Sequence, residues 1–135
     1  MNLQFRIANE NDIKGIIELC NECFNENTSL EYAKKIYLDN KDDVNQIYVI
    51  GILNDKIIAH SKINIIPTIY EDMNTYAILN HVCVKPELRR EHIGTKLLDY
   101  CFKIAKDHNC KCVELWSKNF REAAHDYNTF KVHTK

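Results

Sequence analysis

The chain has 135 residues, of which 45% are hydrophobic and 27% are charged, and its formal net charge is -1. This length allows one domain with a single core, and the balance of apolar and charged residues excludes a disordered chain. A charge so near zero gives no overall basic field for nucleic acid or for an anionic membrane. No apolar run is long enough to span a bilayer, and the N-terminus lacks the charged-then-apolar order of a signal peptide. These features favour a soluble, cytoplasmic protein with one domain over residues 1–135.

Six cysteines are many for a chain of this size. Cys20 and Cys23 have the spacing of a metal-binding pair, but they also lie in a helical pattern, where three-residue spacing puts both on one face. Cys110 and Cys112 are separated by one residue, which suits a strand better than a zinc knuckle. Reduced thiols that fill the core are therefore expected, and no metal site is. Zinc or a disulfide framework is the alternative.

The N-terminal half predicts strands and helices with clear ends. Ser29 can cap the second of two amphipathic helices, and the Asn54-Asp55 turn between two β-branched segments predicts an antiparallel hairpin. The expected elements are a strand over residues 3–7, helices over 13–24 and 30–38, and strands over 46–53 and 56–66.

The C-terminal half opens with an almost wholly apolar strand over residues 75–84, which is expected to be central and covered on both faces. An amphipathic helix over residues 93–106 and a strand over 110–116 follow. Strand, helix and strand with a short return imply a parallel pair joined by a right-handed crossover. Residues 119–130 favour a last helix. Together these elements predict an α/β fold with a mixed, mostly antiparallel twisted sheet flanked by helices.

Residues 81–100 carry the most specific pattern: a strand, a basic loop, a lone glycine and a helix. A helix N-terminus presents unpaired N–H groups and a partial positive charge, so a loop entering it can wrap a pyrophosphate where little side-chain bulk intervenes. Arg89 and Arg90 add cationic groups, and Gly94 permits close approach. The same residues are also compatible with a solvated basic loop in which the glycine serves helix–strand packing.

The segment VKPELRREHIGTKLL, preceded by an apolar strand, resembles the acetyl-CoA-binding motif of the GNAT superfamily of N-acetyltransferases. Arg89 takes the first place of that motif and Gly94 the last, and the element order from residue 1 to about residue 130 also resembles the family. The resemblance implies a GNAT-like fold with acetyl-CoA as cosubstrate. It also implies transfer of acetyl to a primary amine of a small molecule or a protein by direct attack.

The resemblance implies a set of site residues. In the family, the pantetheine arm pairs with the backbone of the central strand, and an N–H group corresponding to Val82 or Cys83 polarises the thioester carbonyl. His81 on the same strand is a candidate for relaying the amine proton, with a purely structural histidine as the alternative. The residues that the resemblance places around acetyl-CoA are Val82, Cys83, Val84, Arg89, Arg90, Glu91, His92, Ile93, Gly94 and Thr95.

Two positions depart from the family pattern. His92 stands where the motif has its first glycine. A left-handed backbone there would cost roughly 1–2 kcal/mol, and the imidazole either crowds the diphosphate or contacts it. In the closing helix, Asn128 stands where the family has the tyrosine that protonates the leaving thiolate. Tyr127 can take that role only after a shift of one residue, about 100° around a helix, and packing is the alternative.

The chain also ends where the family has a Gly-Phe pair and two further strands. The tail FKVHTK matches neither that turn nor a strand, so a truncated member lacking the last two strands is expected, with an exposed edge beside residues 110–116. An exposed edge favours association, and a homodimer is one outcome. A catalytically impaired CoA-binding or assembly module of the same fold is the alternative to an active N-acetyltransferase.

Overall fold

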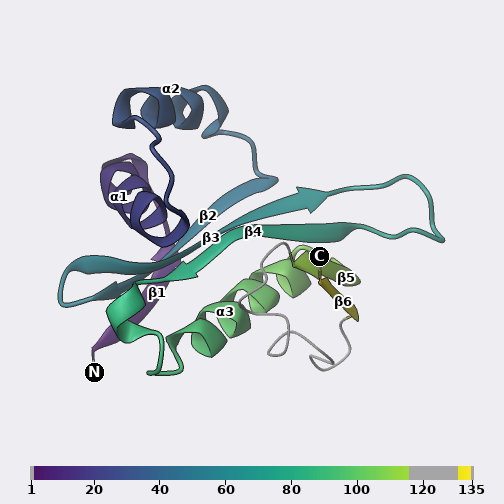
Figure 1. The fold of residues 1–135 in the computed structure, drawn as a ribbon. Helices are drawn as coiled ribbons and strands as arrows, with labels where there is room; N and C mark the ends of the chain where they lie inside the picture. Colours follow the sequence, from purple (N-terminus) through teal and green to yellow (C-terminus); the bar gives the residue numbers. More distant parts are fainter. Residues whose placement is uncertain (1, 116–130, 135) are drawn as a thin grey trace.

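The computed structural model describes residues 2–115 and 131–134, which form one sheet with helices on both faces (Figure 1). The strands are β1 (Leu3–Ile7), β2 (Gln46–Leu53), β3 (Lys56–Ile66), β4 (Tyr76–Val84), β5 (Cys112–Leu115) and β6 (Lys131–Thr134). The helices are α1 (Ile13–Phe24), α2 (Leu30–Asn40) and α3 (Ile93–Asp107), with short 3-10 turns at Glu10–Asp12 and Pro86–Leu88. Each element predicted within the described residues is present, with ends shifted by at most two residues.

The strands follow one another across the sheet in the order β1-β2-β3-β4-β5-β6. β1 to β4 pair antiparallel, whereas β5 is parallel to β4 and β6 is parallel to β5. This arrangement confirms the mixed, mostly antiparallel sheet. The turn between β2 and β3 has φ values of 52° at Asn54 and 65° at Asp55, which is the backbone that a two-residue type I′ hairpin requires.

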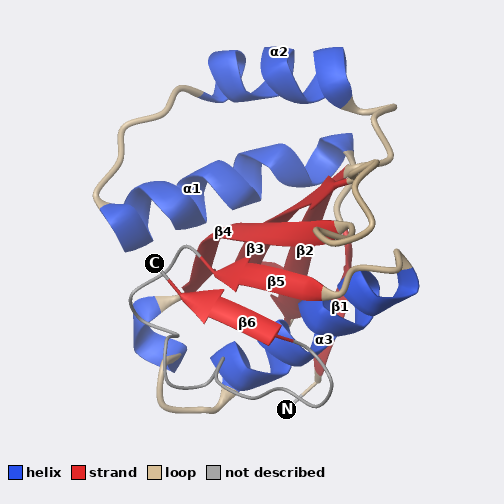
Figure 2. Cartoon of the chain, turned by 90° about the vertical axis from the view of Figure 1, so that its right-hand side faces the viewer, coloured by secondary structure: helices blue, strands red, loops and turns tan. Residues whose placement is uncertain are grey.

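The helices cover the two faces of the sheet unequally. Figures 1 and 2 show α1 and α2 on one face and α3 on the other. α3 packs a continuous apolar stripe on its face, and Leu97, Cys101 and Phe102 are fully buried there against residues such as Ile63 and Leu79. The stripe recurs at helical spacing, so burial of apolar surface holds α3 in place.

On the other face, α1 and α2 differ in how firmly they are held. α1 buries Ile13, Ile16, Leu19 and Cys20, whereas α2 has no buried residue. α2 begins where predicted, because the Ser29 hydroxyl accepts a hydrogen bond from the Tyr32 N–H at 3.1 Å. Cover on this face therefore depends mainly on α1, which ends at Phe24.

The C-terminal tail corrects one expectation. Lys131–Thr134 forms β6, which pairs with β5 from Cys112↔Lys131 to Leu115↔Thr134. Two of its residues are β-branched, and the open edge of β5 supplies hydrogen-bond partners that a four-residue segment lacks alone. The outer edge of β5 is therefore paired, and the predicted loss of two strands is not confirmed. The helix predicted over residues 119–130 lies outside the described residues.

Candidate active site

β4 contains a bulge at the histidine that the sequence singles out. Its register against β3 passes from His60↔Cys83 to Lys62↔Asn80, so β4 advances three residues while β3 advances two. His81 takes a positive φ of 51° there, and its side chain is exposed. The expectation that this strand is covered on both faces is wrong at this point, because Asn80 is only half-buried and His81 is exposed.

The bulge divides β4 into two segments with different neighbours. Residues 76–79 pair with β5, and the last pair is Leu79↔Leu115. Val82, Cys83 and Val84 lie beyond that pairing, in the segment that leads to the loop before α3. Their side chains are buried, so any contact of these residues with a ligand would be made by backbone groups.

The N-terminus of α3 presents unpaired N–H groups. The first backbone bond of the helix runs from the Lys96 N–H to the His92 carbonyl oxygen at 3.3 Å, and His92 provides no side-chain cap. The N–H groups of Ile93, Gly94 and Thr95 precede that bond. They are the donors that a helix N-terminus offers to an anion.

His92 and Gly94 differ in backbone conformation. His92 has φ 60° and ψ 20°, a left-handed conformation that costs a non-glycine residue roughly 1–2 kcal/mol. Histidine is among the residues that adopt this region more readily than most. No described glycine has a positive φ. The backbone conformation at position 94 therefore does not require a glycine. What distinguishes Gly94 is that it places no side chain beside the N–H donors.

The two arginines of the loop have different surroundings. Arg89 donates from Nε to the Val84 carbonyl oxygen at 3.3 Å, and its guanidinium contacts the Cys23 thiol. The same carbonyl lies 3.4 Å from Cys23 Sγ, so Arg89 links the loop to α1. Arg90 and Glu91 are exposed, and neither side chain bonds to a described residue.

His81 is paired with a carboxylate that the sequence did not indicate. Its Nε2 lies 3.1 Å from Glu26 Oε2, and the Phe24 ring packs edge-on against the imidazole at 5.1 Å between centroids. With the Nε2 hydrogen donated to Glu26, the imidazole lone pair is on Nδ1. Glu26 follows the end of α1 and is 55 residues away in sequence, so no local spacing could have revealed the pair.

Two buried titratable groups near this site, His60 and Cys83, have pKa values shifted toward their uncharged forms. Burial lowers the pKa of His60 to about 4, and its Nδ1 lies 2.8 Å from the Val49 carbonyl oxygen. Contacts with the thiol of Cys20 and burial both raise the pKa of Cys83, which argues against a thiolate nucleophile. No disulfide joins any of the six cysteines, all of which lie within the described residues.

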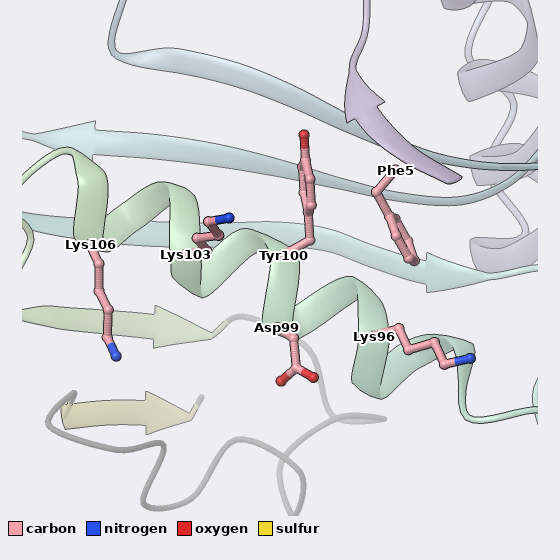
Figure 3. Close-up of a pocket in the computed structure, with 6 residues that line it drawn as sticks. All are labelled: Phe5, Lys96, Asp99, Tyr100, Lys103 and Lys106. Atoms are coloured by element: carbon pink, nitrogen blue, oxygen red, sulfur yellow. The ribbon is translucent and has the colours of Figure 1, made fainter. Parts of the chain in front are cut away.

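Two hollows of the surface lie away from these groups. One of about 560 Å³ lies between β1 and the outer side of α3 (Figure 3), where Phe5 stacks on Tyr100 at 5.7 Å between centroids. Its other lining residues are Lys96, Asp99, Lys103 and Lys106. A second hollow of about 670 Å³ lies between α1 and the β2–β3 hairpin. Neither includes His81 or the three N–H donors of α3, so the candidate site consists of exposed groups outside both hollows.

The described residues contain neither a candidate membrane-spanning helix nor a candidate metal-binding cluster. No helix there combines the length and the apolar character needed to cross a bilayer. Over the same residues, no three His, Cys, Asp or Glu side chains gather as a metal-binding group.

Solved structures that share this fold include several acetyltransferases. The glucosamine-6-phosphate N-acetyltransferase of Arabidopsis thaliana superimposes with a TM-score of 0.79 at 16% identity, covering 95% of this chain and 94% of that one. A predicted acetyltransferase with acetyl-CoA from Clostridium acetobutylicum gives 0.76 at 20% identity, with 93% and 88% covered. An aminoglycoside 6'-N-acetyltransferase of Acinetobacter haemolyticus gives 0.74 at 17% identity, with 96% and 94% covered. At these identities the likeness shows the fold.

Sequence comparison addresses the family directly. No curated protein matches the chain. The sequence model described as "Acetyltransferase (GNAT) family" matches residues 13–128, which is most of the chain. That match agrees with the sheet order and with the loop that precedes α3. The chain belongs to the acetyltransferase (GNAT) family.

Proposed function

We propose that this family member is an N-acetyltransferase that transfers acetyl from acetyl-CoA to a primary amine by direct attack. Acetyl-CoA supplies an activated thioester, and the amine nitrogen forms a C–N bond to the acetyl carbon while the C–S bond breaks. The observation that carries the proposal is the His81–Glu26 pair at the bulge of β4. The base candidate there directly precedes residues 82–84, the backbone segment that leads to the loop before α3.

The residues around the α3 N-terminus fit the pyrophosphate of CoA. The N–H groups of Ile93, Gly94 and Thr95 have no side-chain cap, and Gly94 adds no bulk beside them. The exposed Arg90 and His92 can add positive charge at the same end. Along β4, the backbone of residues 82–84 is proposed to align the pantetheine arm, with the N–H of Val82 or Cys83 polarising the thioester carbonyl.

The proton transfers are assigned to side chains of this chain. His81 Nδ1 accepts the proton that the attacking amine loses, and Glu26 holds the imidazole in the tautomer that makes Nδ1 the acceptor. The departing thiolate, whose conjugate thiol has a pKa of about 8.5, needs one proton. Tyr127, which lies outside the described residues, is the proposed donor. The first transfer has a geometric basis, and the second follows from the family pattern.

Replacing His81 tests the proposal where it is strongest. His81→Gln is expected to lower kcat by about 10²- to 10⁴-fold in an assay that follows thiol release from acetyl-CoA with a panel of amines. CoA affinity and the free energy of unfolding should stay near those of the unsubstituted protein. An unchanged kcat would remove His81 from the chemistry. For Tyr127→Phe, an unchanged rate near neutral pH would assign that tyrosine to packing.

A second variant separates binding from chemistry. Gly94→Trp places an indole beside the N–H donors and is expected to abolish CoA binding while the fold is kept. CoA at 100 times its Kd should raise the unfolding free energy of the unsubstituted protein by about 2.7 kcal/mol, and that rise should be absent in the variant. CoA binding without turnover on any amine would instead favour the catalytically impaired binding module. Absence of binding would reject both.

A further inference from the structure

Lys62 occupies an unusual position for a lysine. It lies in β3, is half-buried, and its Nζ donates to the Gln46 side-chain oxygen at 3.0 Å. The ammonium also lies over the Tyr48 ring, 5.3 Å from its centroid. Among the described residues it forms no ion pair with a carboxylate.

The surroundings of Lys62 leave its charge only partly balanced. Burial lowers the pKa of Lys62, and the carboxylate of Asp43 opposes that effect from a distance. Asp43 Oδ2 accepts a hydrogen bond from the Gln46 Nε2 at 3.0 Å, so one amide separates the ammonium from that negative charge. A half-buried ammonium without a direct counter-ion gains when an anion binds it.

The position of Lys62 relates it to the candidate base. Lys62 is the Cα partner of Asn80 across the β3–β4 ladder, and His81 follows Asn80. Cross-strand and sequential Cα spacings together put the Lys62 and His81 backbones within roughly 9 Å of each other. The Lys62 side chain stacks over Tyr48, and the His81 side chain meets Glu26 and Phe24 at the end of α1. Both therefore lie on the α1 and α2 face of the sheet.

Two charged groups of opposite sign lie on this part of the face. Glu26 brings a carboxylate beside His81, where an amine would approach, and Lys62 brings an ammonium on the neighbouring strand. A molecule with an amino group and an anionic group a few bonds apart complements these two charges. A purely cationic amine leaves Lys62 unmatched.

We propose that Lys62 binds a carboxylate or phosphate of the acceptor, so that the substrate class is small amines that also carry an anionic group. The inference rests on the proposed function, because it places the amine at His81. The alternative for Lys62 is a structural one, in which the Asp43–Gln46–Lys62 chain only anchors the residues before β2. The two differ in whether substrate selectivity depends on the charge of Lys62.

Matched acceptors and variants distinguish these roles. O-phosphoethanolamine is compared with ethanolamine, and β-alanine with β-alaninamide, by kcat/KM from thiol release. The unsubstituted protein is expected to favour the anionic member of at least one pair by about 10- to 100-fold, the strength of a hydrogen bond between charged groups. Lys62→Met should abolish that preference by raising KM for the anionic acceptor, Lys62→Arg should retain it, and Lys103→Met on α3 should leave it unchanged. The phosphate and carboxylate pairs identify which anion is preferred.

A binding measurement keeps this test independent of turnover. The same four compounds are titrated by NMR into the CoA-saturated full chain and into its Lys62→Met variant. Binding of an anionic amine that Lys62→Met removes supports the anion site even if no amine is acetylated, in which case the proposed function fails alone. Three outcomes would each overturn the inference. The protein could show the same kcat/KM and affinity for the member with an anionic group and the member without one in both pairs, the preference could persist in Lys62→Met, or neither anionic amine could bind.

Discussion

The face of the sheet that packs on α3 and the face under α1 and α2 are covered to different extents. Under α3 the apolar surface is continuous, and Leu79, Leu97 and Phe102 are fully buried. On the other face, the apolar cluster under α1 is smaller and gives way to the half-exposed Lys62 and Asn80.

The difference follows from where the helices end. α3 runs for 15 residues with six buried positions, whereas α1 runs for 12 residues and stops at an asparagine, Asn25, in the left-handed conformation. α2 continues over that face but buries no residue. The polar groups proposed to act on substrate lie near the end of α1, beyond which no described helix buries residues against this face. One face therefore stabilises the fold, and the other leaves backbone and polar side chains accessible.

The largest stability effect is expected on the α3 face. Phe102→Ala removes a fully buried ring and leaves a cavity, so the free energy of unfolding should fall by about 3–5 kcal/mol. Asn80→Ala on the opposite face should change it by less than about 0.5 kcal/mol. Urea denaturation of both variants measures the contrast. Similar losses in the two variants would contradict the division between the faces.

A pH effect of intermediate size is expected from His60. Its folded pKa of about 4 lies below the unfolded value of about 6.5, so the unfolded chain binds the proton first as the pH falls. Burial of neutral His60 makes its full contribution to the unfolding free energy above pH 6.5. Between about pH 6.5 and 4 that contribution is lost, which lowers the unfolding free energy by roughly 3 kcal/mol.

The His60 contribution can be isolated from other groups by a difference measurement. Unfolding free energies of the unsubstituted protein and of His60→Phe are compared from pH 7 to pH 4. The value for the unsubstituted protein minus the value for His60→Phe should fall as the pH falls. Arg6 lowers the pKa of Asp12, so that pair loses its contribution as the pH falls through the acidic range, in both proteins alike. A constant gap would mean that His60 is not buried in the neutral form.

Local patterns were enough to predict most of the described fold. Helical spacing identified the helices, Asn54-Asp55 marked the hairpin, and Ser29 marked the cap of α2. These features depend on neighbours in sequence, which is why the sequence alone carries them.

Features that depend on distant contacts could not be predicted in this way. The bulge at His81 is invisible in a nearly continuous apolar strand, because no alternation is present to be interrupted. Glu26 reaches His81 across 55 residues, and Lys62 meets Gln46 only through strand pairing. β6 was missed because its short segment is stabilised by the edge of β5.

The smallest effect should arise at α2, the least firmly held element of the α1 and α2 face. Ser29→Ala removes the cap on the Tyr32 N–H and should cost about 1 kcal/mol. Since α2 has no buried residue, that loss is expected in local opening, with a smaller change in global unfolding. Amide hydrogen exchange should therefore quicken across Leu30–Asn40 while α3 stays protected. Asn27→Ala, an exposed change in the same loop, is the control, and equal quickening of α3 would show that α2 opens only with the whole fold.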